Sequence, residues 1–363
     1  MTGAVAAWIG TALKNPSQLL ALSLREWEAV IAQARSANLM AFLAMRLSDA
    51  GALDDVPIQP RTHFTSALTV EQAQRLSVLR ELDHLRFALS SVKADIVLLK
   101  GAAYLLANLS MARGRMFTDI DILVPRAHLS EVEAALMLTG WATTHLDAYD
   151  QRYYREWMHE LPPMRHVTRG TVVDVHHAIV PLTARWHPDS DKLLGAAIAV
   201  QSEPTFKVLA PIDMVLHSAT HLFQNEELSQ GLRDLVDIDA LLNVFSSSPA
   251  FWRELVERAH ELDLSRPLHH ALRYASLILH SDVPADVLKS MARAGPARPV
   301  QALLDSLFMR GLQPADPDAS GRLKPLALGL LYMRAHWLRM PPGLLMRHLA
   351  IKAVRREPDD RPI

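Results

Sequence analysis

The feature that most constrains the fold is a short strand-rich stretch, residues 94–177, enclosed by two long helical regions. In residues 5–90 apolar side chains recur every three or four positions, which predicts helices. The pattern changes at ADIVLL (94–99), a β-branched run, and helical spacing returns from about residue 205. We therefore expect an α+β fold, in which a small mixed sheet is flanked by N- and C-terminal helical regions.

Strand-like segments follow one another at 94–99, 117–124, 141–146 and 165–177. The last one contains the turn Thr168-Arg169-Gly170, and two strands joined by so tight a turn must be antiparallel. This is why the sheet is expected to be mixed. We divide the chain into an N-terminal helical region (1–92), an α/β core (93–200), a C-terminal helical region (201–310), and a linker with a basic helical tail (311–363).

Composition argues against several classes of function. The chain has 363 residues with 38 Lys and Arg against 39 Asp and Glu, so no overall charge attracts nucleic acid. It has no cysteine, which excludes disulfides, thiolate metal sites and thiol catalysis; this fits a reducing compartment, and we expect a cytoplasmic protein. We read no signal peptide and no run of about 18 apolar residues, so no transmembrane segment is expected.

The C-terminal tail, residues 324–356, mixes apolar residues with several arginines and lysines. We favour a helix that packs on the domain and leaves a basic face in water. A helix that lies on a membrane surface is the less favoured alternative.

Two aspartates stand one residue apart in the apolar stretch RMFTDIDILV (115–124). Side chains at positions i and i+2 of a strand point to the same face, so Asp119 and Asp121 are expected to lie side by side. Two like charges on a half-buried strand are costly unless a cation or a basic side chain neutralises them. For an isolated pair, the plainer alternative is an exposed strand end whose aspartates cap the next turn.

Three further features favour a metal-dependent nucleotide site. A later strand, VVDVHH, carries Asp174 and His176 on one face. Lys100 and Gly101 lie at a strand-to-helix junction, where free backbone N–H groups suit a phosphate. Arg115, just before the aspartate pair, is placed to neutralise anionic oxygens.

The segment LLKGAAYLLANLSMARGRMFTDIDILV (98–124), followed by VVDVHH, resembles the nucleotidyltransferase superfamily with the polymerase-beta-type fold. More narrowly, it is similar to a bacterial family of uncharacterised nucleotidyltransferases flanked by helices. That family continues into a helical region with a histidine and an Arg-x-x-x-Asp element, which LHSATHL and LRDLVDID match here. The resemblance extends over residues 25–245, and the core (93–200) is therefore expected to be the nucleotidyltransferase core.

The resemblance implies transfer of a nucleoside monophosphate from an NTP, with ATP as the expected donor, to an unknown acceptor, and it implies Mg²⁺ (or Mn²⁺) as cofactor. The residues that it implies for catalysis and metal binding are Asp119, Asp121 and Asp174. Those that it implies for nucleotide binding are Lys100, Gly101 and Arg115. One departure concerns the turn, because the superfamily's Gly-Ser or Gly-Gly is Lys-Gly-Ala-Ala here and offers no hydroxyl to a phosphate.

Other polar residues are expected near the site. His176 is expected to flank it, whereas His177 points to the opposite face of its strand and packs. His221 lies four residues after another histidine, the spacing of a zinc site, yet a packing or substrate-lining role is favoured. Arg233 and Asp237 are either a plain helix ion pair or part of the cleft wall.

Two other functions remain open. The chain is alternatively a catalytically idle nucleotide-binding or partner module, or an enzyme that transfers a sugar from a nucleotide sugar with the same carboxylates. The near-neutral charge disfavours a long nucleic acid as acceptor, so a small molecule, a peptide or a protein hydroxyl is expected.

Overall fold

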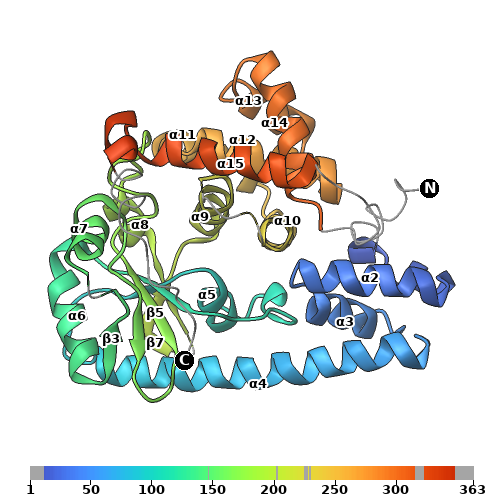
Figure 1. Cartoon of the computed structure of the whole chain (residues 1–363), viewed down its shortest axis with the longest axis horizontal. Coiled ribbons are helices and arrows are strands. Elements are labelled where there is room, and N and C mark those ends of the chain that lie inside the picture. Colours follow the sequence, from blue (N-terminus) through green and yellow to red (C-terminus); the bar gives the residue numbers. More distant parts are fainter. Residues whose placement is uncertain are drawn as a thin grey trace.

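The computed structural model describes residues 12–145, 147–201, 203–224, 228, 230–314 and 323–347, and these residues contain a mixed β-sheet. Within these residues the strand order is β3-β4-β5-β2-β1-β7-β6 (Figure 1). The strands are β1 (Val97–Leu98), β2 (Ile120–Leu123), β3 (Trp141–Thr143), β4 (Met164–His166), β5 (Val172–His176), β6 (Ile198–Val200) and β7 (Glu203–Val208). β2 runs antiparallel to β1 and parallel to β5, and β4 and β5 form the expected antiparallel hairpin. The predicted α+β fold with a small mixed sheet is confirmed.

The hairpin β6–β7 was not among the predicted strands. β7 pairs in parallel with β1, so the sheet continues past residue 200, where the core was predicted to end. The sequence of β7, EPTFKV, alternates between apolar and polar residues only at its end, where Phe206 and Val208 are buried. Its pairing depends on β1, more than a hundred residues earlier, and a local pattern carries no such signal.

The N-terminal helices form a bundle beside the sheet. They are the 3₁₀ helix η1 (Pro16–Ala21), α2 (Leu24–Ser36), α3 (Met40–Asp49) and α4 (Ile58–Ala88). A capping box starts α2, in which Ser23 and Glu26 satisfy each other's backbone N–H groups. The long helix α4 contacts α2, α3 and α6, and in Figure 1 it spans the lower edge of the view under both the bundle and the sheet. It therefore connects the N-terminal helices to the core.

One set of helices lies between the strands of the core along the chain, and a second set follows the last strand. The first set is α5 (Lys100–Leu106), η2 (Ser110–Ala112), η3 (Arg126–His128), α6 (Leu129–Leu138), α7 (Ala148–Trp157) and α8 (Ser190–Ala196). The second is α9 (Pro211–Gln224), α10 (Gly231–Phe245), α11 (Phe251–Glu261), α12 (Ser265–Tyr274) with a π-helical turn (Ala275–Leu279), α13 (Ala285–Ala292), α14 (Arg298–Gly311) and α15 (Leu323–Arg339). Buried apolar side chains form one cluster that runs from the N-terminal helices through the sheet to α15.

The tail is partly visible as α15, which packs against α14 and α9. Its last residue, Arg339, is buried, whereas Leu326, Met333 and Trp337 are exposed. Most of the predicted linker (315–322) and the basic residues after 347 lie outside the described residues. None of the helices in the described residues is long and apolar enough to cross a membrane.

Gly114 offers a test of the contact between the core and the N-terminal helices. Its φ is +76°, and a Cβ there would lie 2.6 Å from the Cα of Phe42 on α3. Gly51 has a similar φ of +65° but open space around it, so it is the matched control. We expect Gly51→Ala to lower the free energy of unfolding by about 1 kcal/mol, from backbone strain alone. Gly114→Ala should cost a further ~1–3 kcal/mol because backbone must move.

Urea denaturation of both variants measures the difference. Equal losses would contradict the close approach of Gly114 to α3.

Candidate active site

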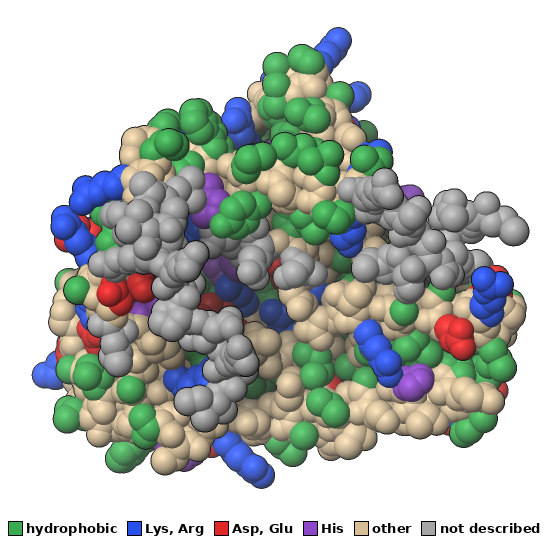
Figure 2. All heavy atoms as spheres, viewed as in Figure 1, with side chains coloured by type: hydrophobic (Ala, Val, Ile, Leu, Met, Phe, Trp, Pro, Cys, Tyr) green, Lys and Arg blue, Asp and Glu red, His purple; other side chains and the backbone are tan. Residues whose placement is uncertain are grey.

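Three aspartates, two on neighbouring strands and one just before the first of these strands, line one cleft of about 290 Å³. Asp121 of β2 stands in register with Asp174 of the parallel strand β5, so the two side chains are direct neighbours on one face of the sheet. Asp119 lies two residues before Asp121 and opens onto the same cleft. Figure 2 shows acidic, basic and histidine side chains in and around a hollow near the middle of the molecular surface in this view. The structure thus brings together the three carboxylates that the sequence singled out.

Asp121 is buried and held by two cationic groups. Lys100 Nζ lies 3.1 Å from its Oδ1, and His176 Nε2 lies 3.0 Å from the same oxygen. Lys100 reaches it because α5 begins directly after β1, and His176 reaches it because it follows Asp174 by two residues on β5. Burial alone would raise the pKa of Asp121, yet the charges of Lys100 and His176 hold that pKa well below its ordinary value. Asp121 is therefore ionised throughout the neutral range.

Asp174 has the opposite electrostatic environment. Its Oδ1 is buried and accepts no hydrogen bond from the described residues. Burial, and then the nearby charges of Asp121 and Glu160, raise its pKa to about 7. Asp119 also has a raised pKa, because the cleft removes water from it and Asp121 repels its charge. The charge of Lys100 and a hydrogen bond from Thr118 Oγ1 at 2.9 Å oppose this rise for Asp119, and the charge of His176 opposes it for Asp174.

Glu160, a further carboxylate of the cleft, contacts the ring nitrogen of His176 that does not face Asp121. Its Oε2 lies 3.2 Å from Nδ1, so the imidazole bridges Glu160 and Asp121. Although burial opposes it, these two charges raise the pKa of His176 and favour the imidazolium. Glu160 reaches this place because residues 159–161 run alongside β5, where Leu161 N donates to Val175 O at 2.9 Å. Nitrogen or oxygen atoms of His159, Glu160 and His176 lie within 4.8 Å of one another, a spacing that can hold a metal ion.

The remaining walls of the cleft come from helices far apart in the sequence. Tyr153 and Tyr154 come from α7, His221 from α9 and Arg339 from the end of α15. His221 Nδ1 lies 3.6 Å from Asp234 of α10. Sequence reasoning missed both tyrosines, His159, Glu160 and Arg339 as cleft residues. No spacing within the chain relates them to the aspartates, and only their position beside β5 or over the cleft identifies them.

Other predicted site residues lie behind the cleft rather than on its wall. Arg115 forms an ion pair with Asp237, which also pairs with Arg233 at 3.1 Å. Gly101 lies against Arg115, because a Cβ on this glycine would meet Arg115 Nε at 2.7 Å. Neither Gly101 nor these three charged residues line the cleft, so their roles in nucleotide binding stay predictions. His177 lines a different cavity, as expected for the opposite face of its strand.

A family model described as "Uncharacterised nucleotidyltransferase" matches residues 23–280. The chain belongs to this nucleotidyltransferase family. The match runs from the cap of α2 to the residue after the π-helical turn, and it contains the sheet, the three aspartates and Lys100. Helices α13, α14 and α15, and with them Arg339, lie outside it. Comparisons with curated proteins and with solved structures gave no match.

Asp174, whose buried Oδ1 has no hydrogen-bond partner among the described residues, predicts a pH-dependent stability in the absence of divalent metal. Because its folded-state pKa of about 7 lies above its usual 3.8, the ionised form destabilises the fold. The cost is absent near pH 4, grows between pH 4 and 7 and is complete above 7. In EDTA at pH 8, Asp174→Asn should therefore raise the free energy of unfolding by on the order of a few kcal/mol. Urea titrations across this range should show the gain shrinking toward pH 4, and a gain independent of pH would contradict the assignment.

Glu160→Gln tests the bridge through His176. The pKa of His176 is raised from its usual 6.5, so the stability that its imidazolium adds is complete below that pH and disappears as the pH rises through the folded-state value. The variant should lose about 1–3 kcal/mol at pH 6, the contribution of a charged hydrogen bond, and less at pH 9.

Glu156→Gln is the matched control, since Glu156 forms an exposed ion pair with Arg152 on α7. We expect it to change stability by less than about 1 kcal/mol at either pH. Equal effects of the two variants would rule out the bridge.

Proposed function

We propose that this protein transfers a nucleoside monophosphate from an NTP, with ATP as the expected donor, to a hydroxyl-bearing acceptor, with Mg²⁺ as cofactor. One observation carries the proposal: three carboxylates converge in one cleft, and a buried oxygen of Asp174 has no hydrogen-bond partner among the described residues. Membership of a nucleotidyltransferase family supports the reaction class.

The donor set fits Mg²⁺, a hard cation that prefers carboxylate oxygens. Asp119, Asp121 and Asp174 would hold it. Lys100 and His176 both contact Oδ1 of Asp121, which leaves Oδ2 for a further ligand. When bound, the ion offsets the carboxylate repulsion and neutralises charge on the triphosphate.

The chain's own residues supply the rest of the chemistry. Asp174 lines the cleft and its Oδ1 has no hydrogen-bond partner among the described residues, so Asp174 would accept the proton of the acceptor hydroxyl. The acceptor oxygen then forms a bond to the α-phosphorus while the bond to pyrophosphate breaks. Lys100 and Arg339 would offset the negative charge of the phosphates.

We place the base of the nucleoside against α7. Tyr153 and Tyr154 line the cleft, and aromatic faces are common stacking partners for a base. The volume of about 290 Å³ is close to the lower end of small-molecule sites, which favours a small acceptor or the side chain of a peptide over a long polymer.

Pyrophosphate release tests the reaction. With Mg²⁺ and ATP, and an acceptor from a metabolite or peptide panel, Asp119→Asn should lower the rate by about 100-fold or more, because transition-state charge loses its partner. Asp95→Asn removes an exposed carboxylate that pairs with Lys207 at 2.6 Å, and it should leave the rate unchanged.

Thermal stabilisation by nucleotide and Mg²⁺ separates the alternatives. We expect an NTP to raise the melting temperature of the wild type and not of Asp119→Asn. Stabilisation by nucleotide sugars alone would indicate sugar transfer instead. Nucleotide binding without turnover on any acceptor would indicate an idle binding module.

A further inference from the structure

The wall of the carboxylate cleft beside β5 carries a cluster of His159, Glu160 and His176. Nitrogen or oxygen atoms of these three side chains lie within 4.8 Å of one another. All three line the cleft, yet none of the side chains is more than 19% exposed. Because buried polar atoms need partners, the contacts of these atoms decide what the cluster can bind.

The two contacts of the His176 ring leave a place for a cation. Its Nε2 lies 3.0 Å from Asp121 Oδ1, and a nitrogen that faces a carboxylate carries a hydrogen. In the neutral ring, Nδ1 then directs a lone pair at Glu160 Oε2, 3.2 Å away. Two facing lone pairs repel, so either a proton or a metal ion must lie between them. A carboxylate that binds the other nitrogen, as Asp121 does, is the usual outer partner of a metal-bound histidine.

His159 adds a third possible ligand to the cluster. Its Nδ1 is buried and has no hydrogen-bond partner among the described residues. Its Nε2 lies 4.0 Å from Glu160 Oε2, too far for a hydrogen bond. Ligand atoms around a tetrahedral ion with bonds of ~2.0–2.1 Å are about 3.3 Å apart. The separations in the cluster are close enough to this value that side-chain rotation brings the three ligand atoms onto one ion.

Backbone hydrogen bonds fix the cluster on both sides of Glu160. The carbonyl of His159 accepts from the backbone N–H of His177 at 2.8 Å, and Leu161 N donates to Val175 O at 2.9 Å. The segment that carries two of the ligands is therefore attached to the strand that carries the third. Ligands held in this way lose little conformational freedom when an ion binds.

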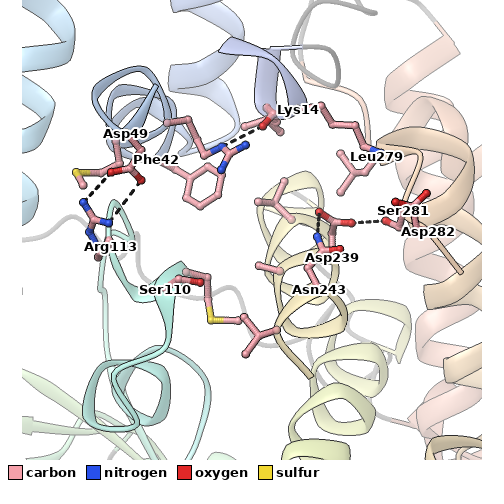
Figure 3. A pocket seen from close by; sticks show the side chains of 17 residues that line it. Lys14, Phe42, Asp49, Ser110, Arg113, Asp239, Asn243, Leu279, Ser281 and Asp282 are labelled. Carbon is pink, nitrogen blue, oxygen red and sulfur yellow. Dashed lines mark hydrogen bonds and ion pairs between the residues drawn. The ribbon is translucent and has the colours of Figure 1, made fainter. Parts of the chain in front are cut away.

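The larger cavity, of about 480 Å³, between the N-terminal helices and α10 differs in this respect (Figure 3). None of the described residues that line it belongs to a cluster of this kind. Arg113 pairs there with Asp49 at 3.0 Å, and Asp239 accepts hydrogen bonds from Ser281 and Asn243. These side chains already have partners, whereas the buried Nδ1 of His159 has none among the described residues.

The ligand types distinguish this cluster from the Mg²⁺ site proposed for the aspartates. Mg²⁺ prefers oxygen ligands. Two imidazoles and one carboxylate suit Zn²⁺ and related first-row ions, and with Zn²⁺ they leave a fourth position open. Because all three side chains line the cleft, an ion bound to them is accessible from it.

We propose that His159, Glu160 and His176 form a second metal site, which binds Zn²⁺ or a related first-row divalent ion. The ion replaces the proton on Nδ1 of His176, which is released to water, while Nε2–H still donates to Asp121. The site binds its ion without nucleotide and does not depend on the proposed transfer.

The experiment uses the full chain, stripped of metal with EDTA and desalted, and titrated with Co²⁺ in an excess of Mg²⁺. Visible absorption reports Co²⁺ bound by nitrogen ligands, and one equivalent of Zn²⁺ should displace it. We expect one ion per chain with a Kd below ~10 µM. His159→Phe, which keeps a ring but no nitrogen, and Glu160→Gln should each weaken binding by about 10-fold or more.

His187→Gln is the matched control, because His187 is exposed and lies outside the cluster, and it should leave Co²⁺ binding unchanged. Asp119→Asn should also keep Co²⁺ binding while it lowers the proposed transfer, so the two proposals can fail separately. If His159→Phe fails to fold by circular dichroism, His159→Ala replaces it.

Three outcomes would overturn the second metal site. The first is that no Co²⁺ binds in excess Mg²⁺. The second is that binding survives both the His159 variant and Glu160→Gln. The third is that His187→Gln or Asp119→Asn weakens binding as much as these variants do, which would place the ion on surface histidines or on the aspartates.

Discussion

The buried carboxylate of Asp121 is stable only because Lys100 and His176 stand on either side of its Oδ1. Desolvation of an unpaired carboxylate would cost several kcal/mol, so the fold must deliver both cations to the same atom. Both contacts depend on the start of α5 shortly after β1 and on the parallel pairing of β2 with β5. Glu160 contacts the second ring nitrogen of His176. The backbone of Glu160 also pairs with that of His176, so residues 159–161 lie alongside β5.

A second set of charges connects the sheet to the covering helices. Asp237 of α10 accepts from both Arg115 and Arg233, and the ring of Tyr104 on α5 lies 5.6 Å from the Arg115 guanidinium. Gly101 is required beneath Arg115 because a Cβ would collide with it. Arg115, four residues before Asp119 in the sequence, therefore holds α10 against the core.

The cleft depends on contributions from three parts of the chain. The core supplies the carboxylates and, through α7, two tyrosines; α9 supplies His221, and α15 supplies Arg339 from outside the region that the nucleotidyltransferase family model matches. In the absence of metal, Lys100 and His176 lower the pKa of Asp121, whereas burial and the charges of Asp121 and Glu160 raise the pKa of Asp174 on the adjacent strand. Such a difference between paired acids arises from their partners and not from their residue type.

The sequence by itself determined what depends on local periodicity. A two-residue repeat puts Asp119 and Asp121 on one face, and likewise Asp174 and His176, while His177 points away. Apolar spacing located the helices on both sides of the sheet, and the motifs identified the family. Only the tertiary structure decided the register of Asp121 against Asp174 and the addition of β7 to the sheet. It also decided the ion pair between Arg115 and Asp237 and the positions of Glu160 and Arg339 at the cleft. These contacts join residues far apart in the chain, and their energies come from burial and charge pairing, which no single segment of sequence contains.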